Sequence, residues 1–160
     1  MRAMTFLEGF NHLEDDCIYL EIIEKNEGNR EELPYYYYVI YLQSGIQIGK
    51  ISIRIGHNKH SYYNGNIGYE IYPEHRGKKH SLRACKLVLE VARAHGMNFL
   101  YICCAENNVP SRKIIESPGA KLQEIKVPPK DYIYYYEGMP AQRIYRLDLL
   151  IRCNVCIIMV

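Results

Sequence analysis

The turn between Pro73 and Leu82 carries the residue types that point most directly to chemistry. It reads PEHRGKKHSL and connects a predicted strand to a predicted helix. Unpaired backbone N–H groups and the positive end of the dipole attract anions to a helix N-terminus. The side chains of Arg76, Lys78 and Lys79 would add charge for a pyrophosphate or a nucleotide phosphate, and Gly77 would let the backbone approach closely. On these residues alone, a phosphate site and a solvated basic turn are equally good interpretations.

Strands and helices around this turn must position it. Segments rich in β-branched and aromatic residues, often alternating with polar ones, predict strands over 17–23, 35–42, 46–55, 66–72, 99–105, 120–127, 132–137 and 143–150. The apolar alternation in 46–55 changes phase near Gly49, which predicts a β-bulge.

Two segments change to helical spacing. Apolar residues three or four apart, from Leu82 to Ala92, predict a helix over 81–95 that Gly96 ends. Asn108 can cap a shorter helix that runs through Ser117. The order of strands, helix, strand, helix and strands predicts an α+β or mixed α/β sheet with a crossover helix, not a doubly wound dinucleotide fold.

Length and composition predict one domain over residues 1–160. The net charge of +2 is too small to imply a polyanion partner, so we expect no nucleic acid. No apolar run reaches the roughly 18 residues of a membrane span, and the N-terminus lacks a secretory signal, which together predict a cytoplasmic protein. The apolar residues 151–160 predict an extra edge strand, a tail, or a self-association surface that would make a homodimer.

Two longer segments carry a family resemblance. GYEIYPEHRGKKHSLRACKLVLEVARAHGM and the later ENNVPSRKIIESPGAKL resemble the GNAT superfamily of N-acetyltransferases, especially its bacterial ribosomal-protein and small-amine branch. The resemblance covers residues 48–125. The family's Arg/Gln-x-x-Gly-x-Gly/Ala loop falls on residues 76–81, and its Asn-x-x-Ser/Ala element falls on Asn108 and Ser111. The resemblance implies a GNAT-like acyl-CoA N-acyltransferase fold, with a central, mostly antiparallel sheet flanked by helices, and acetyl-CoA as co-substrate.

The resemblance also assigns residues to the cofactor. Backbone amides of one loop would hold the pyrophosphate: Arg76, Gly77, Lys78, Lys79, His80 and Ser81. The strand edge at Ile71 and Tyr72 would pair with the pantetheine arm. Asn108, in one element with Ser111, would contact the pantetheine amides, and Arg112 or Lys113 would reach an adenosine phosphate.

Four positions depart from the family pattern, among them Ser81, where glycine or alanine is usual, and Pro118, where a helical apolar residue is usual; the other two bear on function. Lys79 stands where glycine is usual, and a positive φ there would cost a lysine on the order of 1 kcal/mol. Ile115 stands where the family often has the tyrosine that protonates the leaving thiolate, and isoleucine has no proton to give. A non-catalytic protein that binds coenzyme A, or regulates through it, is therefore the first alternative.

An amine must lose its proton before it attacks a thioester, and a carboxylate is a suitable base. Glu70 is the first candidate, because it lies in a strand whose Ile67, Tyr69 and Ile71 share the opposite face. The second candidate is Glu106. An exposed or salt-bridged Glu70 without a catalytic role is the competing interpretation. The predicted function is transfer of an acetyl group from acetyl-CoA to a primary amine, in a small molecule or a peptide, by direct attack.

Other motifs favour simpler interpretations. Cys153-x-x-Cys156 and His57-x-x-His60 have ligand-like spacing, but without a second cysteine pair we expect no metal site. The tyrosine runs at 35–38 and 134–136 could stack on bases, which keeps a nucleic-acid-binding module as a further alternative. Packing within strands explains the tyrosines more simply.

Overall fold

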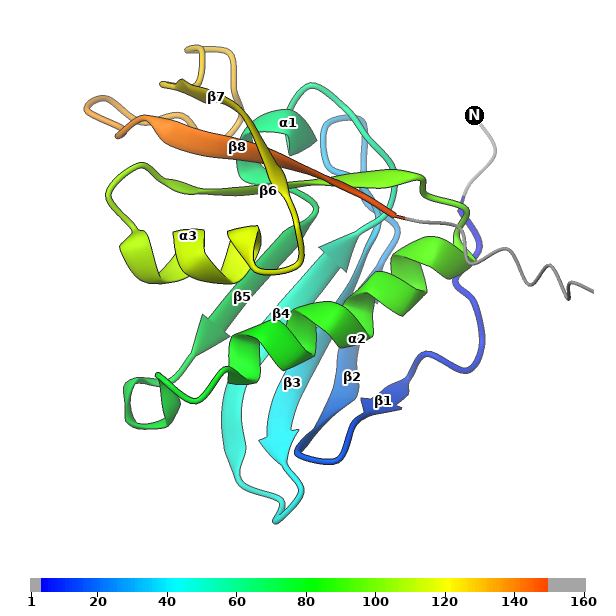
Figure 1. The fold of residues 1–160 in the computed structure, drawn as a ribbon. Helices are drawn as coiled ribbons and strands as arrows, with labels where there is room; N and C mark the ends of the chain where they lie inside the picture. The colour runs from blue at the N-terminus through cyan, green and yellow to red at the C-terminus, as the bar shows by residue number, and fades with distance from the viewer. Residues whose placement is uncertain (1–3, 150–160) are drawn as a thin grey trace, which may run out of the picture.

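The computed structural model describes residues 4–149, which form two antiparallel sheets and a few helices (Figure 1). The larger sheet has the order β1 (His12–Glu14), β2 (Ile18–Asn26), β3 (Tyr35–Leu42), β4 (Gln47–Arg54) and β5 (Ile67–Ile71). The smaller sheet has the order β6 (Phe99–Ala105), β8 (Gln142–Asp148) and β7 (Lys121–Lys126). The helices are α1 (Ser61–Asn64), α2 (His80–Ala94) and α3 (Val109–Glu116), and a 3₁₀ turn, η1 (Pro73–His75), precedes α2.

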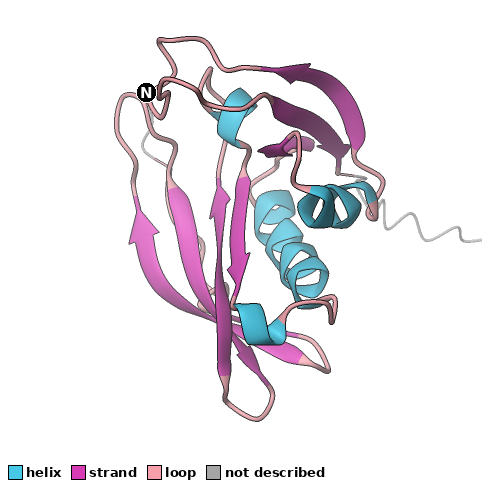
Figure 2. Ribbon diagram, turned by 90° about the vertical axis from the view of Figure 1, so that its left-hand side faces the viewer, coloured by secondary structure: helices cyan, strands magenta, loops and turns pink. Residues whose placement is uncertain are grey.

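Helix α2 covers one face of the larger sheet, as the side view shows (Figure 2). Its apolar stripe, including Val88 and Ala92, is fully buried against strand residues such as Tyr36, Tyr38 and Ile51. Since side chains alternate along a strand, the residues between these core positions point to the opposite face. The predicted packing role is therefore confirmed for Tyr36 and Tyr38.

The β-bulge predicted near Gly49 is present. Ile40 pairs with Gly49 while the next residue, Tyr41, pairs with Gln47, so Ile48 is the additional residue of β4. The bulge lets both Ile48 and Ile51 reach the core, although three positions separate them.

A buried asparagine joins the two sheets. Asn66, which is fully buried, donates from Nδ2 to the carbonyl oxygens of Arg54 and Gly56 at 3.0 and 2.8 Å. Its Oδ1 accepts from the Tyr101 N–H at 3.0 Å, and its own N–H donates to the Tyr101 carbonyl oxygen at 2.6 Å. Gly65, at φ +76°, allows this approach, because a Cβ there would lie 3.0 Å from the backbone nitrogen of Cys103. The start of β5 is thereby fixed beside β6.

Two sequence predictions about the strands were wrong. The expected single sheet is divided in two, because no ladder of backbone hydrogen bonds connects β5 to β6 within residues 4–149. Residues 132–137 are not a strand but successive turns, with Tyr132 bonded to Pro129 and Tyr135 bonded to Tyr132 through the backbone. Tyr132 is buried against aromatic neighbours of α1, so its packing there replaces the expected strand pairing.

The other predicted elements are present with shifts of a few residues at their ends. Within the described part of the chain, none of the helices has the length and apolar character that crossing a membrane requires. The predictions for 151–160, including the extra strand and the Cys153–Cys156 pair, fall outside the described residues.

Candidate active site

The loop before α2 leaves the N-terminus of that helix without a side-chain cap. Lys79 has φ +62°, the one positive φ of a non-glycine residue among residues 4–149, and Gly77 has φ +77°. The positive φ considered for Lys79 is therefore present. Lys79 is also the N-cap of α2, where no side chain accepts a hydrogen bond from the first-turn N–H groups. Burial, and then the charge of Lys78, lower the pKa of His80. The helix start thus presents uncapped N–H donors beside basic side chains, the arrangement that an anion requires.

A cleft of about 520 Å³ extends from this helix start. Three groups of residues line it: Tyr69, Glu70 and Ile71 of β5; His75, Arg76, Gly77, Lys79, His80 and Ser81 of the loop and α2; and Asn108, Pro110, Ser111, Lys113 and Ile114 at α3. Most of the residues that the resemblance assigned to the cofactor are thus brought together. Lys78 and Tyr72 do not line the cleft.

The edge of β5 that faces the cleft is defined by its pairing with β4. The N–H of Tyr72 donates to the Ile48 carbonyl oxygen, and the carbonyl oxygen of Asn66 accepts from Arg54. Successive residues of a strand direct their backbone groups to opposite sides. The N–H groups of Tyr69 and Ile71 therefore face the cleft, while that of Tyr72 is engaged with β4.

Two side-chain contacts fix the end of β5 beside the cleft. Arg76 donates from Nε to the Ile71 carbonyl oxygen at 2.8 Å, which ties the loop to the end of β5. Gln47 donates to the Tyr72 hydroxyl at 2.6 Å, which holds that side chain against β4. Arg76 therefore contributes to the shape of the cleft as well as to its charge.

Helix α3 forms the opposite wall. Asn108 accepts from the Ser111 N–H at 3.2 Å and so caps the helix, as predicted. The Ser111 hydroxyl in turn accepts a hydrogen bond from the Tyr69 hydroxyl at 3.1 Å, which connects α3 to β5. Ile115 is only 2% exposed and packs in the core. The isoleucine that replaces the family's usual tyrosine therefore has a packing role.

A second cavity, of about 350 Å³, lies over the face of the larger sheet that is turned away from α2. Four carboxylates line it, Glu24, Glu31, Glu32 and Glu70, together with the cations Lys50 and Arg54. Further lining residues are Tyr35, Tyr37, Ser52, Tyr134 and several residues at α1. The cavity therefore carries more acidic than basic side chains.

Tyr69 and Glu70 are the two residues that line both the cleft and this cavity. Glu70 is exposed and lies opposite Lys50 in the register of β4 and β5. Its neighbours Ile67 and Ile71 are buried, so the predicted division of faces along β5 is confirmed. Glu106 is exposed after the end of β6 and lines neither space.

Two loops, 56–64 and 126–132, are the segments from which a substrate pocket is expected in this sequence. The first contributes Asn58, His60, Ser61 and Asn64 to this cavity, and the second contributes no lining residue. Alternation along β3 and β4 already placed Tyr35, Tyr37 and Ser52 on one face, and that pattern was the available signal. The sequence had no comparable signal for α1 or for the turns at 132–137, because these contribute through tertiary packing.

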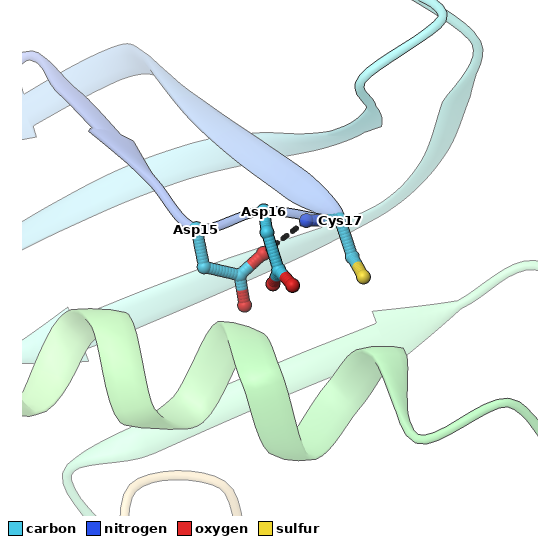
Figure 3. Close-up of side chains that lie close together, drawn as sticks. All are labelled: Asp15, Asp16 and Cys17. Atoms are coloured by element: carbon cyan, nitrogen blue, oxygen red, sulfur yellow. Dashed lines mark hydrogen bonds between the residues drawn. The ribbon is translucent and has the colours of Figure 1, made fainter.

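One further cluster brings together Asp15, Asp16 and Cys17 in the turn before β2 (Figure 3). Asp15 Oδ1 accepts from the N–H groups of Cys17 and Ile18 at 2.8 and 2.9 Å. Arg83 of α2 donates to both aspartates, at 3.0 and 2.9 Å. Burial alone would raise the pKa of Asp15, but the two backbone bonds and Arg83 together lower it. The cluster is explained as a turn that is tied to α2.

Comparison with known proteins agrees with this geometry. Residues 2–121 match the family model described as the acetyltransferase (GNAT) domain. The chain belongs to the GNAT acetyltransferase family. The family, the fold and acetyl-CoA as the acetyl donor of the family are thus confirmed at the level predicted from the sequence. No curated protein sequence matches the chain.

Solved structures show the same fold. The ribosomal-protein-S5-alanine acetyltransferase of Vibrio fischeri is 15% identical, with a TM-score of 0.63 over 86% of this chain and 96% of that one. A GNAT-family acetyltransferase of Bacillus anthracis is 17% identical, with a TM-score of 0.56 over 70% of this chain and 65% of that one. The microcin C7 self-immunity acetyltransferase MccE, in complex with acetyl-CoA and AMP, is 21% identical, with a TM-score of 0.54 over 72% and 61%. This chain thus spans slightly less than two thirds of the length of the last two proteins.

Proposed function

We propose that this protein transfers an acetyl group from acetyl-CoA to a primary amine by direct attack. The observation that carries the proposal is that a single stretch of β5, Tyr69–Glu70, lines both the basic cleft and the acidic cavity. Two substrates that enter from opposite sides of the sheet would meet there.

The cleft fits acetyl-CoA. Its uncapped helix start and its lysines offer a place for the pyrophosphate. The cleft-facing backbone groups of Tyr69 can pair with the pantetheine arm, as an added strand would. The carbonyl oxygen of Ile71 is engaged by Arg76. Asn108 and Lys113 line the other wall. The N–H of Ile71 is well placed to polarise the thioester carbonyl, whereas the N–H of Tyr72 donates to Ile48.

The cavity fits the amine. Carboxylates outnumber cations among its lining residues, and a negative surface potential concentrates ammonium groups. Glu70 is at the boundary of the two spaces, so it would accept the proton that the amine must lose. The neutral amine nitrogen then bonds to the acetyl carbon while the carbon–sulfur bond breaks and its electron pair leaves on sulfur. The second nitrogen proton passes to solvent, and the thiolate takes a proton from solvent on release. The amine can belong to a small molecule or to a peptide.

The test is release of coenzyme A thiol from acetyl-CoA across a panel of small amines and peptide N-termini. In Glu70→Gln we expect kcat/KM to fall by about 10²-fold or more, with loss of the acidic limb of its pH profile. Glu27→Gln, an exposed glutamate outside both spaces, is the matched control and should match the unmodified protein. If Glu106→Gln lost activity instead, the base would be Glu106.

The alternatives give different results in a binding experiment. Coenzyme A at one hundred times its Kd should stabilise the folded protein by about 2.7 kcal/mol. The same stabilisation without acetyl transfer to any amine would indicate a non-catalytic binding protein. Stabilisation by an oligonucleotide, and none by coenzyme A, would refute the proposal.

A further inference from the structure

Two buried polar atoms at α1 have no hydrogen-bond partner among residues 4–149. They are Nε2 of His60 and Oδ1 of Asn64. His60 is only 4% exposed, and both residues line the acidic cavity. The other buried atoms of this kind belong to His80, Arg93 and Arg143, which lie outside that cavity. Because burying a polar atom without a partner costs free energy, two such atoms in one cavity wall call for an explanation.

The two atoms offer one donor and one acceptor. Nδ1 of His60 accepts from the Ile133 N–H at 3.4 Å, which fixes the neutral tautomer with its proton on Nε2. Nε2 is therefore a donor, whereas Oδ1 of Asn64 is an acceptor. His60 directly precedes α1 and already has helical backbone angles, with φ −80° and ψ −36°. Since residues four apart share one face of a helix, the two side chains are neighbours.

The spacing along β5 determines how far this pair lies from the proposed base. Helix α1 ends at Asn64, β5 begins at Ile67, and Glu70 is three residues further on. At about 3.3 Å for each residue, Glu70 lies about 10 Å along the strand from its start. Between them the cavity is lined by the small residues Ser52 and Gly68, which are paired across β4 and β5. A single amino acid does not span this distance, but an extended peptide covers it in about three residues.

We propose that His60 and Asn64 bind the backbone of a peptide acceptor about three residues beyond the amine that receives the acetyl group. This inference rests on the proposed function, with the amine at Glu70. His60 donates to the carbonyl oxygen of one peptide residue, and Asn64 accepts from the N–H of the same residue. An extended residue presents both groups to one side, as it does in the hydrogen-bonded pairs of an antiparallel sheet. Because only backbone groups are bound, this subsite selects acceptors by length and not by side chain.

The test compares an alanine dipeptide with an alanine pentapeptide, both as C-terminal carboxamides so that neither adds a negative charge. Only the longer acceptor reaches α1, so kcat/KM of the unmodified protein should be about 10- to 100-fold higher for the pentapeptide. His60→Phe and Asn64→Ala should each lower the pentapeptide value about 5- to 10-fold. Their dipeptide values should stay within twofold, which also establishes that both variants fold. His57→Phe and Asn11→Ala, at exposed residues outside the cavity, are the matched controls and should change neither value.

Ester substitution distinguishes a direct contact from an indirect effect on the cavity wall. An ester in place of one peptide bond removes a single N–H from the pentapeptide. At the residue bound by Asn64, it should lower kcat/KM of the unmodified protein about 5- to 10-fold and cause no further loss in Asn64→Ala.

Equal kcat/KM for the two peptides in the unmodified protein would overturn the inference, and so would an equal loss for both peptides in the two variants. Acetylation of the dipeptide or of small amines would still support the proposed function in either case. Absence of acetyl transfer to every amine and peptide would overturn both.

Discussion

The link between the two sheets depends on one side chain, and its removal gives the clearest stability prediction. Asn66→Ala deletes the three side-chain hydrogen bonds to Arg54, Gly56 and Tyr101. Because Asn66 is fully buried, water cannot replace these bonds without opening the joint.

The magnitude follows from those three bonds. At about 1 kcal/mol net for each, the free energy of unfolding should fall by about 3 kcal/mol. For a domain of this size, each kcal/mol corresponds to about 2–4 °C in Tm, so Tm should fall by about 6–12 °C. The same loss loosens the start of β5, and we expect kcat to fall because Tyr69 and Glu70 follow within four residues.

The measurement is unfolding in urea with far-UV circular dichroism, supported by calorimetric melting. Asn11→Ala is the control: Asn11 is exposed and, among the described residues, its side chain makes no hydrogen bond, so its effect should stay within 0.5 kcal/mol or so. A loss below about 1 kcal/mol in Asn66→Ala would show that the sheets are held together mainly by apolar packing, and the reasoning would be refuted.

Two further predictions concern the loop and pH. Glycine accepts a positive φ without strain, so Lys79→Gly should be about 1 kcal/mol more stable than Lys79→Ala. Both variants lose the same charge and should weaken coenzyme A binding equally. Equal stability of the two variants in urea titrations would contradict the strain. Burial lowers the pKa of His57 and His95, so the unfolded chain binds more protons at mildly acidic pH. The free energy of unfolding should thus be fully retained at pH values above 6.5, the ordinary pKa of histidine, and should decrease at lower pH. His95→Gln should lessen that decrease. Greater stability on acidification would count against this assignment.

The spacing of residues within one segment predicted the helices and strands that depend on that segment alone. The spacing of Leu82, Cys85 and Leu89 identified α2 because one helical stripe faces the core. The strand β3 was predicted, but four consecutive tyrosines could not indicate which of them pack in the core. The structure buries Tyr36 and Tyr38 and places Tyr35 and Tyr37 at the cavity. The loop residues of the cleft were predicted as well, since their order with Asn108 and Ser111 matched a family pattern.

Tertiary contacts determined what the sequence could not predict. The division into two sheets depends on how Asn66 meets Tyr101, thirty-five residues away. Residues 132–137 have a strand-like composition, but Tyr132 finds its packing partners at α1 and the backbone turns instead. For Glu70 the sequence indicated its face on the strand, and only the structure showed that this face borders a cavity.

The proposed role of Glu70 depends on one property of β-strands. Consecutive residues point to opposite faces, so Glu70 can face the cavity while the side chain of Tyr69, one peptide away, reaches Ser111 of α3. A helix would place neighbouring side chains about 100° apart on a shared surface, and it could not separate the two substrates in this way. A shift of one residue in the register of β5 would exchange the two faces. The bonds of Asn66 to β6, and of Tyr72 to Ile48, hold the strand at both ends against that shift. The strand that joins the two sheets therefore also determines that Glu70 faces the acidic cavity.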